Sequence, residues 1–343
     1  MLVVAPNWLG DAVMALPAFA DIRRAHAQAR LIVAARPSIA PLYSMVPGVD
    51  STILTQWRGS MTDRRLLQGD VRQILTERVE RAILFPNSFA SAWVLRRARV
   101  RDRWGYAADL RRPLLTRAVR RPRGSRHQGA YYQHLVKELG ISNGPLEPVL
   151  TVPESAIEEA RSLLRARGWD ESRRLLVVAP GAAYGTAKRW LPRHFAALIS
   201  RAIRETGVHV VLVGAPADAV SASLVLESTS AAEREAIVDL TGATTLQALA
   251  GVMSVAAACV SNDSGAMHLA GAVGTPLAAV FGPTREKETA PLTRHGGRSA
   301  VLINHVWCRP CMLRECPFEH QCMTGLKPAR VFESVRVLMG TGS

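Results

Sequence analysis

The segment from Ala256 to Pro283 constrains the fold more than any other part of the chain, because it predicts a complete unit of strand, helix and strand. Residues 256–260 are small and apolar, as in a strand that is buried on both faces. Residues 261–265 are polar and turn-forming, residues 266–272 predict a short helix, and residues 277–281 predict the next buried strand. This alternation is typical of α/β domains with a parallel sheet.

The loop of this segment predicts an anion site. Ser264 and Gly265 place free backbone N–H groups in the first turn of the predicted helix, at its positive end. A diphosphate would bind there, at the carboxyl edge of the sheet. The alternative is an ordinary helix that is capped by a Ser or Asx side chain, and the loop by itself does not decide between the two.

A short repeat indicates two similar domains. The sequence Leu2–Pro6 recurs letter for letter as Leu176–Pro180, and each copy precedes a polar or glycine-bearing loop and a helix. A chain of 343 residues has room for two α/β domains. Prolines between 145 and 153 lead into a charged helical stretch and indicate the link. We therefore predict domains at residues 1–157 and 158–343.

Asp11 is the candidate base of the first half. It follows Gly10 at the carboxyl end of a predicted strand and in the first turn of a helix, where the helix dipole stabilises a charged carboxylate that can accept a proton. The alternative is a plain helix N-cap. The other elements predicted here are strands at 2–5, 31–35, 53–54 and 82–85, and helices at 12–25 and 89–97.

The charge of the chain predicts an anionic partner. The net charge is +15, from 43 Lys and Arg against 28 Asp and Glu, which suits nucleic acid, a nucleotide, a phospholipid surface or a phosphorylated glycan. A dense group of arginines would bind phosphate through bidentate forks, although a solvated face is the alternative. These arginines are Arg96, Arg97, Arg99, Arg101, Arg103, Arg111, Arg112, Arg117, Arg120, Arg121, Arg123 and Arg126.

Two further features of the second half concern ligands. The loop after the strand 175–179 carries Lys188 and Arg189 just before a helix, which predicts a second anion-binding element, although its spacing is not that of a P-loop. Asp218 follows the strand 208–213 and is placed to accept a hydrogen bond from a ribose hydroxyl. An aspartate at a helix start is the alternative for Asp218.

The tail of the chain is rich in cysteine. Its C-x2-C and C-x5-C pairs invite a zinc site, but the second spacing is loose, so we expect a packed lid and keep structural zinc as an alternative that we do not predict. The buried Cys259 is expected to be core, and residues 331–339 predict a final helix. The tail cysteines are Cys308, Cys311, Cys316 and Cys322.

The ordered set of motifs resembles glycosyltransferase family 9 over nearly the whole chain, and the cysteine tail is similar to that of the branch that adds the second heptose of the lipopolysaccharide core. Ala266 stands where that family has a larger apolar residue. The motifs are Asn7-Trp8-Leu9-Gly10-Asp11, Ala187-Lys188-Arg189-Trp190, Asn262-Asp263-Ser264-Gly265 with Met267-His268, and Phe281-Gly282-Pro283-Thr284.

The resemblance implies a GT-B fold, in which two Rossmann-like domains face each other across a cleft and a terminal helix crosses back to the first. It implies inverting transfer of heptose from ADP-L-glycero-β-D-manno-heptose to the first heptose on Kdo-lipid A, with Asp11 as base. The implied donor residues are Lys188, Asp218, Asp263, Ser264, Gly265, Ala266, Met267 and His268, and the implied acceptor residues are Asn7, Gly10, Arg96, Arg97 and Arg120.

The resemblance implies no required cofactor and no metal ligand, with Mg²⁺ as a non-essential activator. No apolar run is long enough to span a bilayer and no charged-then-apolar leader precedes Met1, so we expect a soluble, intracellular protein. We also expect a cytoplasmic location and a monomer. It would lie at the inner face of the inner membrane, bound to phosphorylated lipid A and core, and would not bind nucleic acid. The alternatives are another ADP-heptose transferase of the family, a nucleotide-sugar epimerase, or a nucleic-acid-binding protein that uses the arginines.

Overall fold

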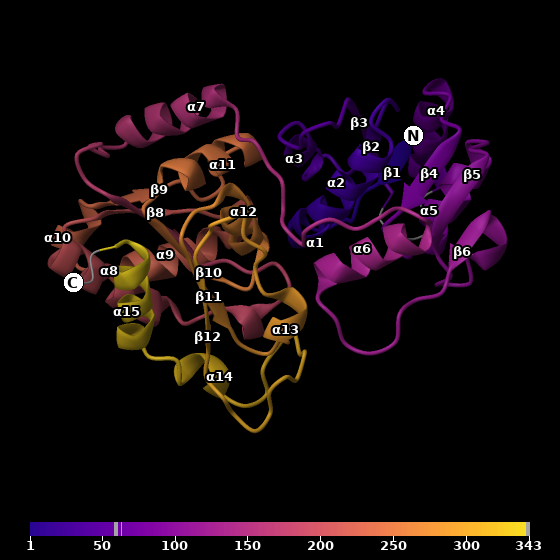
Figure 1. Cartoon of the computed structure of the whole chain (residues 1–343). Coiled ribbons are helices and arrows are strands. Elements are labelled where there is room, and N and C mark those ends of the chain that lie inside the picture. Colours follow the sequence, from indigo (N-terminus) through magenta and orange to yellow (C-terminus); the bar gives the residue numbers. More distant parts are fainter. Residues whose placement is uncertain (58–60, 63, 341–343) are drawn as a thin grey trace. The chain divides into compact units, whose positions relative to one another are not determined.

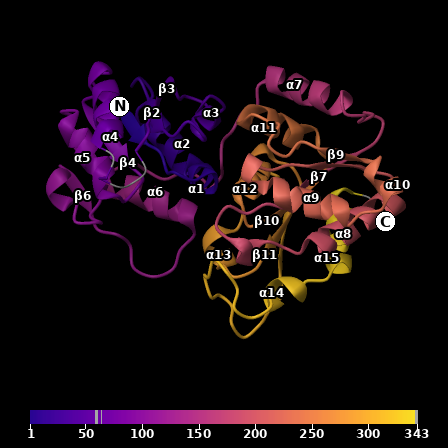
Figure 2. The same ribbon diagram turned by 180° about the vertical axis from the view of Figure 1, so that it is seen from behind.

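The computed structural model describes residues 1–57, 61–62 and 64–340 (Figures 1 and 2). The chain divides into two compact units, Met1–Thr151 and Val152–Ser343. Each unit contains one sheet of six parallel strands with helices packed against it, so the two predicted α/β domains are confirmed. Within the described ranges, no helix is both long and apolar enough to cross a membrane.

The first unit has the strand order β3-β2-β1-β4-β5-β6. Helices α1, α2 and α6 pack together, and α4 packs against α5. The strands are β1 (Leu2–Val4), β2 (Ile32–Ala35), β3 (Ser51–Leu54), β4 (Arg81–Leu84), β5 (Asp102–Tyr106) and β6 (Arg117–Val119). The helices are α1 (Leu9–Met14), α2 (Leu16–Ala25), α3 (Ala40–Tyr43), α4 (Arg64–Thr76), α5 (Phe89–Arg97) and α6 (Gln128–Glu138), with a 3-10 turn η1 (Arg112–Leu114).

The second unit has the strand order β12-β11-β10-β7-β8-β9. Its strands are β7 (Leu175–Ala179), β8 (His209–Leu212), β9 (Ile237–Asp239), β10 (Ala258–Asn262), β11 (Leu277–Phe281) and β12 (Ser299–Ile303). Its helices are α7 (Glu154–Arg165), α8 (Pro192–Thr206), α9 (Ala219–Glu227), α10 (Ala231–Arg234), α11 (Leu246–Val255), α12 (Gly265–Val273), α13 (Glu286–Thr289), α14 (Gln321–Thr324) and α15 (Pro328–Leu338), with 3-10 turns η2 (Thr186–Lys188) and η3 (Pro216–Asp218).

The two sheets share one topology. Counted from its own first strand, each sheet has the order 3-2-1-4-5-6. The repeated sequence supplies that first strand in both units, with Val3 opposite Ile83 and Val177 opposite Cys259. The strand order reverses between β1 and β4 and between β7 and β10, and ligands of such sheets bind beyond the carboxyl ends of the strands at that point.

The boundary between the units differs from our prediction, which fell inside α7. The apolar face of α7 is buried against α11, and an added Cβ at Gly251 of α11 would lie 2.1 Å from the Ala156 carbonyl oxygen of α7. This close packing places the whole of α7 in the second unit. The division therefore falls earlier, between Thr151 and Val152.

The terminal helix, which we expected to cross back to the first domain, has an apolar face that packs within the second unit. The apolar side chains Val331, Phe332 and Val335 of α15 are fully buried in the core of the second unit. They pack there with α8 and the central strands, because one stripe of the helix is apolar. Its main contacts are thus with its own unit.

Two local predictions in the first unit were incomplete. The helix predicted at 12–25 is two helices, α1 and α2, which meet at Ala15 just before Pro17 because proline cannot donate a backbone hydrogen bond. The arginine group contributes two strands, β5 and β6, which were not predicted. Arg103 and Arg111 are buried there, while the other ten arginines of the group are exposed.

Candidate active site

The loops that follow β7 and β10 are joined at the reversal point of the second sheet. Asn262, the last residue of β10, is fully buried. Its Oδ1 accepts a hydrogen bond from the Trp190 N–H at 3.0 Å, and its Nδ2 donates to the Pro180 carbonyl at 2.8 Å. One amide side chain therefore fixes both ends of the lysine-bearing loop beside the loop after β10.

Lys188 and Asp263 meet at this edge of the sheet. The Lys188 Nζ lies 2.7 Å from the Asp263 Oδ2, with the side chains 13% and 4% exposed. The Thr284 hydroxyl donates to the same carboxylate oxygen at 2.6 Å. Asp263 thus holds Lys188 in place, which agrees with a role in fixing the loop. Thr284 is the last residue of the Phe281–Thr284 motif, whose sequence does not reveal this contact.

The first turn of α12 has the properties of an anion site. Ser264 is the N-cap and has an extended backbone, but its hydroxyl pairs with the Ser261 Oγ at 3.0 Å rather than with an N–H group of the described helix. The Gly265 and Ala266 residues of the first turn are half-buried, so their side of the helix is open to a ligand. This arrangement favours anion binding over an ordinary side-chain cap. Met267 and His268 of the same helix are buried.

Asp218 lies against the start of the lysine-bearing loop. Its carboxylate accepts a hydrogen bond from the Ala215 N–H at 3.0 Å. A Cβ added to Gly181 would lie 2.1 Å from the Asp218 Cγ, so a glycine is required for this close approach. The predicted ribose-binding residue therefore lies at the same sheet edge as the loop after β7.

In the first unit, Asp11 is not the helix N-cap. The N-cap of α1 is Trp8, and Asp11 is the third residue of the helix. Its Oδ1 accepts a hydrogen bond from the Tyr132 hydroxyl at 3.4 Å. Burial and the charge of Asp11 raise the pKa of Tyr132 well above its usual value, so that Tyr132 remains a neutral donor. No sequence signal pointed to Tyr132, because it lies far from Asp11 along the chain. The predicted acceptor residues Asn7 and Gly10 lie close to Asp11 in the sequence and are half-buried.

The three predicted acceptor arginines do not share one edge of the first sheet. Arg96 and Arg97 lie in the last turn of α5. Since α5 starts beyond the carboxyl end of β4 and runs back, its last turn lies at the amino edge of the sheet, opposite to the edge that carries Asp11. Arg120 is exposed and directly follows β6, at the carboxyl edge.

Arg111 has a structural role in the same unit. It is fully buried, its Nε donates to the Tyr106 carbonyl at 2.9 Å, and its Nη1 donates to the Pro86 carbonyl. Burial lowers the pKa of Arg111 to about 10. The Arg111 side chain links the carboxyl ends of β4 and β5. Because it is buried, it cannot bind an anionic partner at the protein surface.

The cysteine tail carries unbridged thiols. Cys322 is buried in α14, and the Cys316 Sγ accepts hydrogen bonds from the N–H groups of Phe318 and His320. In the part of the chain that the structure describes, no three His, Cys, Asp or Glu side chains are grouped so that they could hold a metal ion.

Comparison with known proteins agrees with this geometry. The model of "Glycosyltransferase family 9 (heptosyltransferase)" matches residues 70–322. The chain is 30% identical to lipopolysaccharide heptosyltransferase 2 of Salmonella typhimurium, over 99% of this chain and 98% of that protein. It is 29% identical to lipopolysaccharide heptosyltransferase 2 of Escherichia coli K12, with the same coverage.

Solved structures agree as well. The structure of E. coli ADP-heptose LPS heptosyltransferase II superposes with a TM-score of 0.84 at 28% identity, over 99% of this chain and 98% of that chain. A family 9 glycosyltransferase from Veillonella parvula, at 21% identity, has a TM-score of 0.85 over 99% of this chain and 97% of that chain and supports the fold. The GT-B fold class expected from the motifs is thus confirmed. The chain belongs to glycosyltransferase family 9, the heptosyltransferase family.

Proposed function

We propose that this enzyme transfers L-glycero-D-manno-heptose from ADP-heptose to the first heptose of the lipopolysaccharide inner core. The observation that carries the proposal is the Lys188–Asp263 pair beside the open first turn of α12, which suits the diphosphate of a nucleotide sugar. The full-length similarity to lipopolysaccharide heptosyltransferases 2 supports the choice of substrate and of transfer step.

The donor would lie at the reversal point of the second sheet. The backbone N–H groups of Gly265 and Ala266 would bind the diphosphate together with Lys188. Asp218 would accept a hydrogen bond from a ribose hydroxyl. As the bond to the sugar breaks, ADP gains negative charge, and these groups would stabilise it without a required metal, with Mg²⁺ as a non-essential activator.

Asp11 would act as the base. The acceptor hydroxyl gives its proton to the Asp11 carboxylate while its oxygen forms a bond to the anomeric carbon of the heptose. The bond from that carbon to the diphosphate oxygen breaks at the same time, ADP leaves with the electron pair, and the anomeric centre inverts. The hydrogen bond from Tyr132 would orient the carboxylate toward the acceptor.

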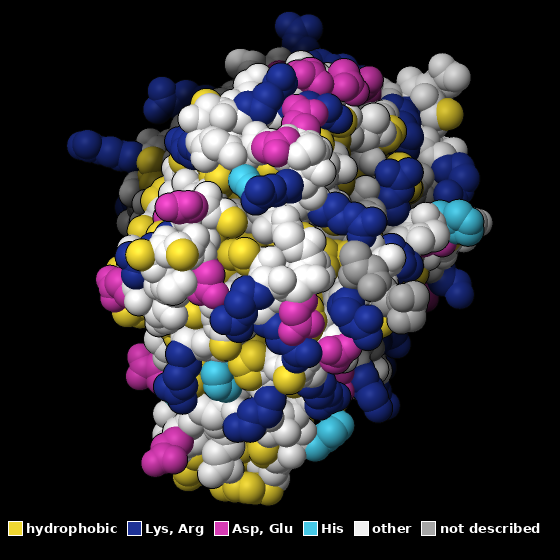
Figure 3. Space-filling view, turned by 90° about the vertical axis from the view of Figure 1, so that its left-hand side faces the viewer, with side chains coloured by type: hydrophobic (Ala, Val, Ile, Leu, Met, Phe, Trp, Pro, Cys, Tyr) yellow, Lys and Arg dark blue, Asp and Glu magenta, His cyan; other side chains and the backbone are white. Residues whose placement is uncertain are grey.

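The proposed acceptor is anionic. The exposed residues Arg120, Arg121 and Arg123, which follow β6, would bind the phosphates of the acceptor at the sheet edge that carries Asp11. We propose a monomer that associates peripherally with the cytoplasmic face of the inner membrane. Each basic residue near an anionic surface contributes about 1 kcal/mol to such binding. Figure 3, which views the side that carries α8, α10 and α15, shows that Lys and Arg side chains are also spread over the second unit, between acidic and hydrophobic groups.

A transfer assay tests the proposal. ADP release is measured with ADP-heptose alone, with an acceptor that lacks heptose, and with an acceptor that carries one heptose. We expect release only with the last. An enzyme of the first transfer step would use the acceptor without heptose, and an epimerase would convert the donor without any acceptor. Binding to DNA or RNA that weakens steeply with salt, in place of transfer, would support the nucleic-acid alternative.

Two variants assign the roles within the assay. Asp11→Ala should abolish transfer while ADP affinity is kept, because the base lies in the other unit from the proposed ADP site. Lys188→Ala should lower ADP affinity by about tenfold or more, since one charge-assisted contact is lost. Turnover retained by Asp11→Ala would remove Asp11 as base, and unchanged ADP affinity in Lys188→Ala would remove Lys188 from the phosphate site.

A further inference from the structure

The Lys188–Asp263 pair leaves the donor site short of positive charge. Because the two groups lie 2.7 Å apart and both are largely buried, the ammonium charge is already compensated by the carboxylate. A nucleoside diphosphate carries at least two negative charges and gains more as it departs. An additional cation at the site would supply the positive charge that the compensated lysine and the neutral backbone amides do not provide.

The cysteine tail contacts the loop that carries Lys188 and the loop that follows β11. The Met312 N–H donates to the Pro283 carbonyl at 3.0 Å, and the Ala187 N–H donates to the Arg314 carbonyl at 3.0 Å. A Cβ added to Gly185 would lie 2.3 Å from the Arg314 carbonyl oxygen, so the two backbones are in direct contact. The tail segment 312–314 is thus fixed against the loop that carries Lys188.

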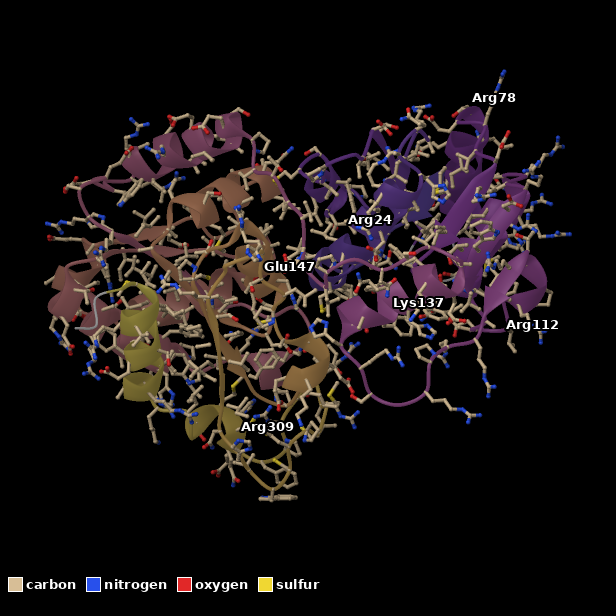
Figure 4. All side chains as sticks on the ribbon, in the orientation of Figure 1. Arg24, Arg78, Arg112, Lys137, Glu147 and Arg309 are labelled. Carbon is tan, nitrogen blue, oxygen red and sulfur yellow. The ribbon has the colours of Figure 1, made fainter. Side chains whose placement is uncertain are left out.

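A second set of contacts joins the tail to residues that follow β11. Arg309, which is labelled in Figure 4, donates from Nη2 to the Thr284 carbonyl at 3.1 Å and forms an ion pair with Glu286 at 3.0 Å. Thr284 in turn donates to Asp263. The tail therefore contacts Thr284, which is bonded to the carboxylate partner of Lys188, as well as the lysine loop.

Lys188 and Arg314 both lie against the ring of Tyr184. The Lys188 Nζ lies 4.9 Å from the centroid of the Tyr184 ring, and the Arg314 guanidinium carbon lies 5.2 Å from the same centroid. The Tyr184 hydroxyl donates to the Met312 carbonyl at 2.9 Å. Arg314 is exposed, and among the described residues no carboxylate forms an ion pair with it. Unlike Lys188, it carries a charge that is uncompensated.

We propose that Arg314 is a second diphosphate-binding cation of the donor site, with Tyr184 as a positioning residue that holds it beside Lys188. The proposal rests on the proposed use of a nucleoside diphosphate donor. The planar guanidinium can bind two phosphate oxygens at once, so Arg314 distinguishes a diphosphate from a monophosphate. In this proposal, the tail positions the Arg314 side chain beside the loop that carries Lys188.

Calorimetric titration of the full chain with ADP and with AMP tests this assignment. Arg314→Gln should lower ADP affinity about tenfold and AMP affinity less than about twofold, because the distal phosphate loses a charge-assisted contact. Arg314→Lys should restore part of the ADP affinity. Arg234→Gln, which removes the same charge from an exposed arginine of α10 in the same unit, is the control and should leave both affinities unchanged.

Tyr184 variants test the positioning role. Tyr184→Phe keeps the ring and should keep the preference for ADP over AMP within about twofold, whereas Tyr184→Leu removes the ring and should lower that preference as Arg314→Gln does. In turnover assays, Arg314→Gln should raise the KM for ADP-heptose more than it lowers kcat. Circular dichroism establishes that each variant is folded.

The outcomes separate this inference from the proposed function. If Arg314→Gln keeps the wild-type ratio of ADP to AMP affinity, the inference is overturned, whether or not the enzyme transfers heptose. If the ratio falls in Arg314→Gln but no heptose is transferred to any acceptor, the second cation stands and the proposed function fails.

Discussion

The Lys188 ammonium lies 2.7 Å from the Asp263 carboxylate, and the two residues come from loops that follow different strands of one parallel sheet. The pair is largely buried, and Thr284 adds a hydrogen bond to the carboxylate. A cation that is held before the nucleotide binds needs no rearrangement when charge develops on the leaving group. Under the proposed function, this pre-organisation would link the fold of the second unit to the transfer reaction.

Asp263→Asn should destabilise the protein. The change leaves the partly buried Lys188 ammonium without its counter-charge, at an expected cost of about 2–4 kcal/mol in the free energy of unfolding. Urea denaturation followed by circular dichroism measures it. The matched control is Glu205→Gln, which breaks an exposed ion pair with Arg201 and should cost less than about 1 kcal/mol. Equal losses in the two variants would show that burial of the lysine pair has no energetic weight.

Asn262→Ala should also lower stability, by about 2–4 kcal/mol. It leaves the Trp190 N–H and the Pro180 carbonyl without partners in a buried place, and each unpaired group costs about 1–3 kcal/mol. The same denaturation assay applies. Asn304→Ala removes a solvent-exposed amide contact to Gln321 and serves as the control. A loss no greater than that of the control would contradict the bridging role of Asn262.

Gly181→Ala should weaken ADP binding by about three- to tenfold, because the new Cβ would collide with the Asp218 carboxylate and displace it. Titration calorimetry with ADP measures the effect. In an Asp218→Ala background the same glycine change should add little, since the displaced group is already absent. Fully additive effects would show that Gly181 acts through something other than Asp218.

Stability should fall on mild acidification through His209. This side chain at the start of β8 is 6% exposed, and burial, with a smaller effect from Arg173, lowers its pKa below the ordinary 6.5. Above pH 6.5 the side chain is neutral in both states and the stability is fully present. As the pH falls from 6.5 through the lower pKa of the folded state, the unfolded chain binds the proton first, and stability is lost.

The measurement is the urea midpoint at about pH 7.5 and about pH 5.5. His209→Gln cannot take up the proton and should show a smaller drop between these two pH values than the wild type. A drop of the same size in both proteins would mean that other groups cause the acid sensitivity.

The strands with continuous apolar sequence were predictable. β7 and β11 lie at the predicted residues, because a strand that is buried on both faces has to be apolar throughout. The strands β5 and β6 were missed because arginines at an edge of the sheet conceal their pattern. The boundary near α7 was misplaced for a similar reason, since local composition does not show which domain a helix packs against.

The candidate site was predictable only in part. The Asn262–Gly265 motif and the lysine loop follow strands, so their placement at the carboxyl edge of a parallel sheet follows from chain direction alone. The partners Tyr132 and Thr284 gave no signal of their roles, and Arg96 and Arg97 were assigned by charge although α5 carries them to the opposite edge.

The order of apolar and polar residues by itself indicated two parallel α/β units and the polar loops at their strand ends, because strands that are buried on both faces are apolar throughout and alternate here with helices. Only the tertiary structure decided that Lys188 is paired with Asp263, that Asn262 joins two loops, and that the tail brings Arg314 to Tyr184. Such contacts join residues that are distant along the chain, and their distances depend on packing, which no local pattern encodes.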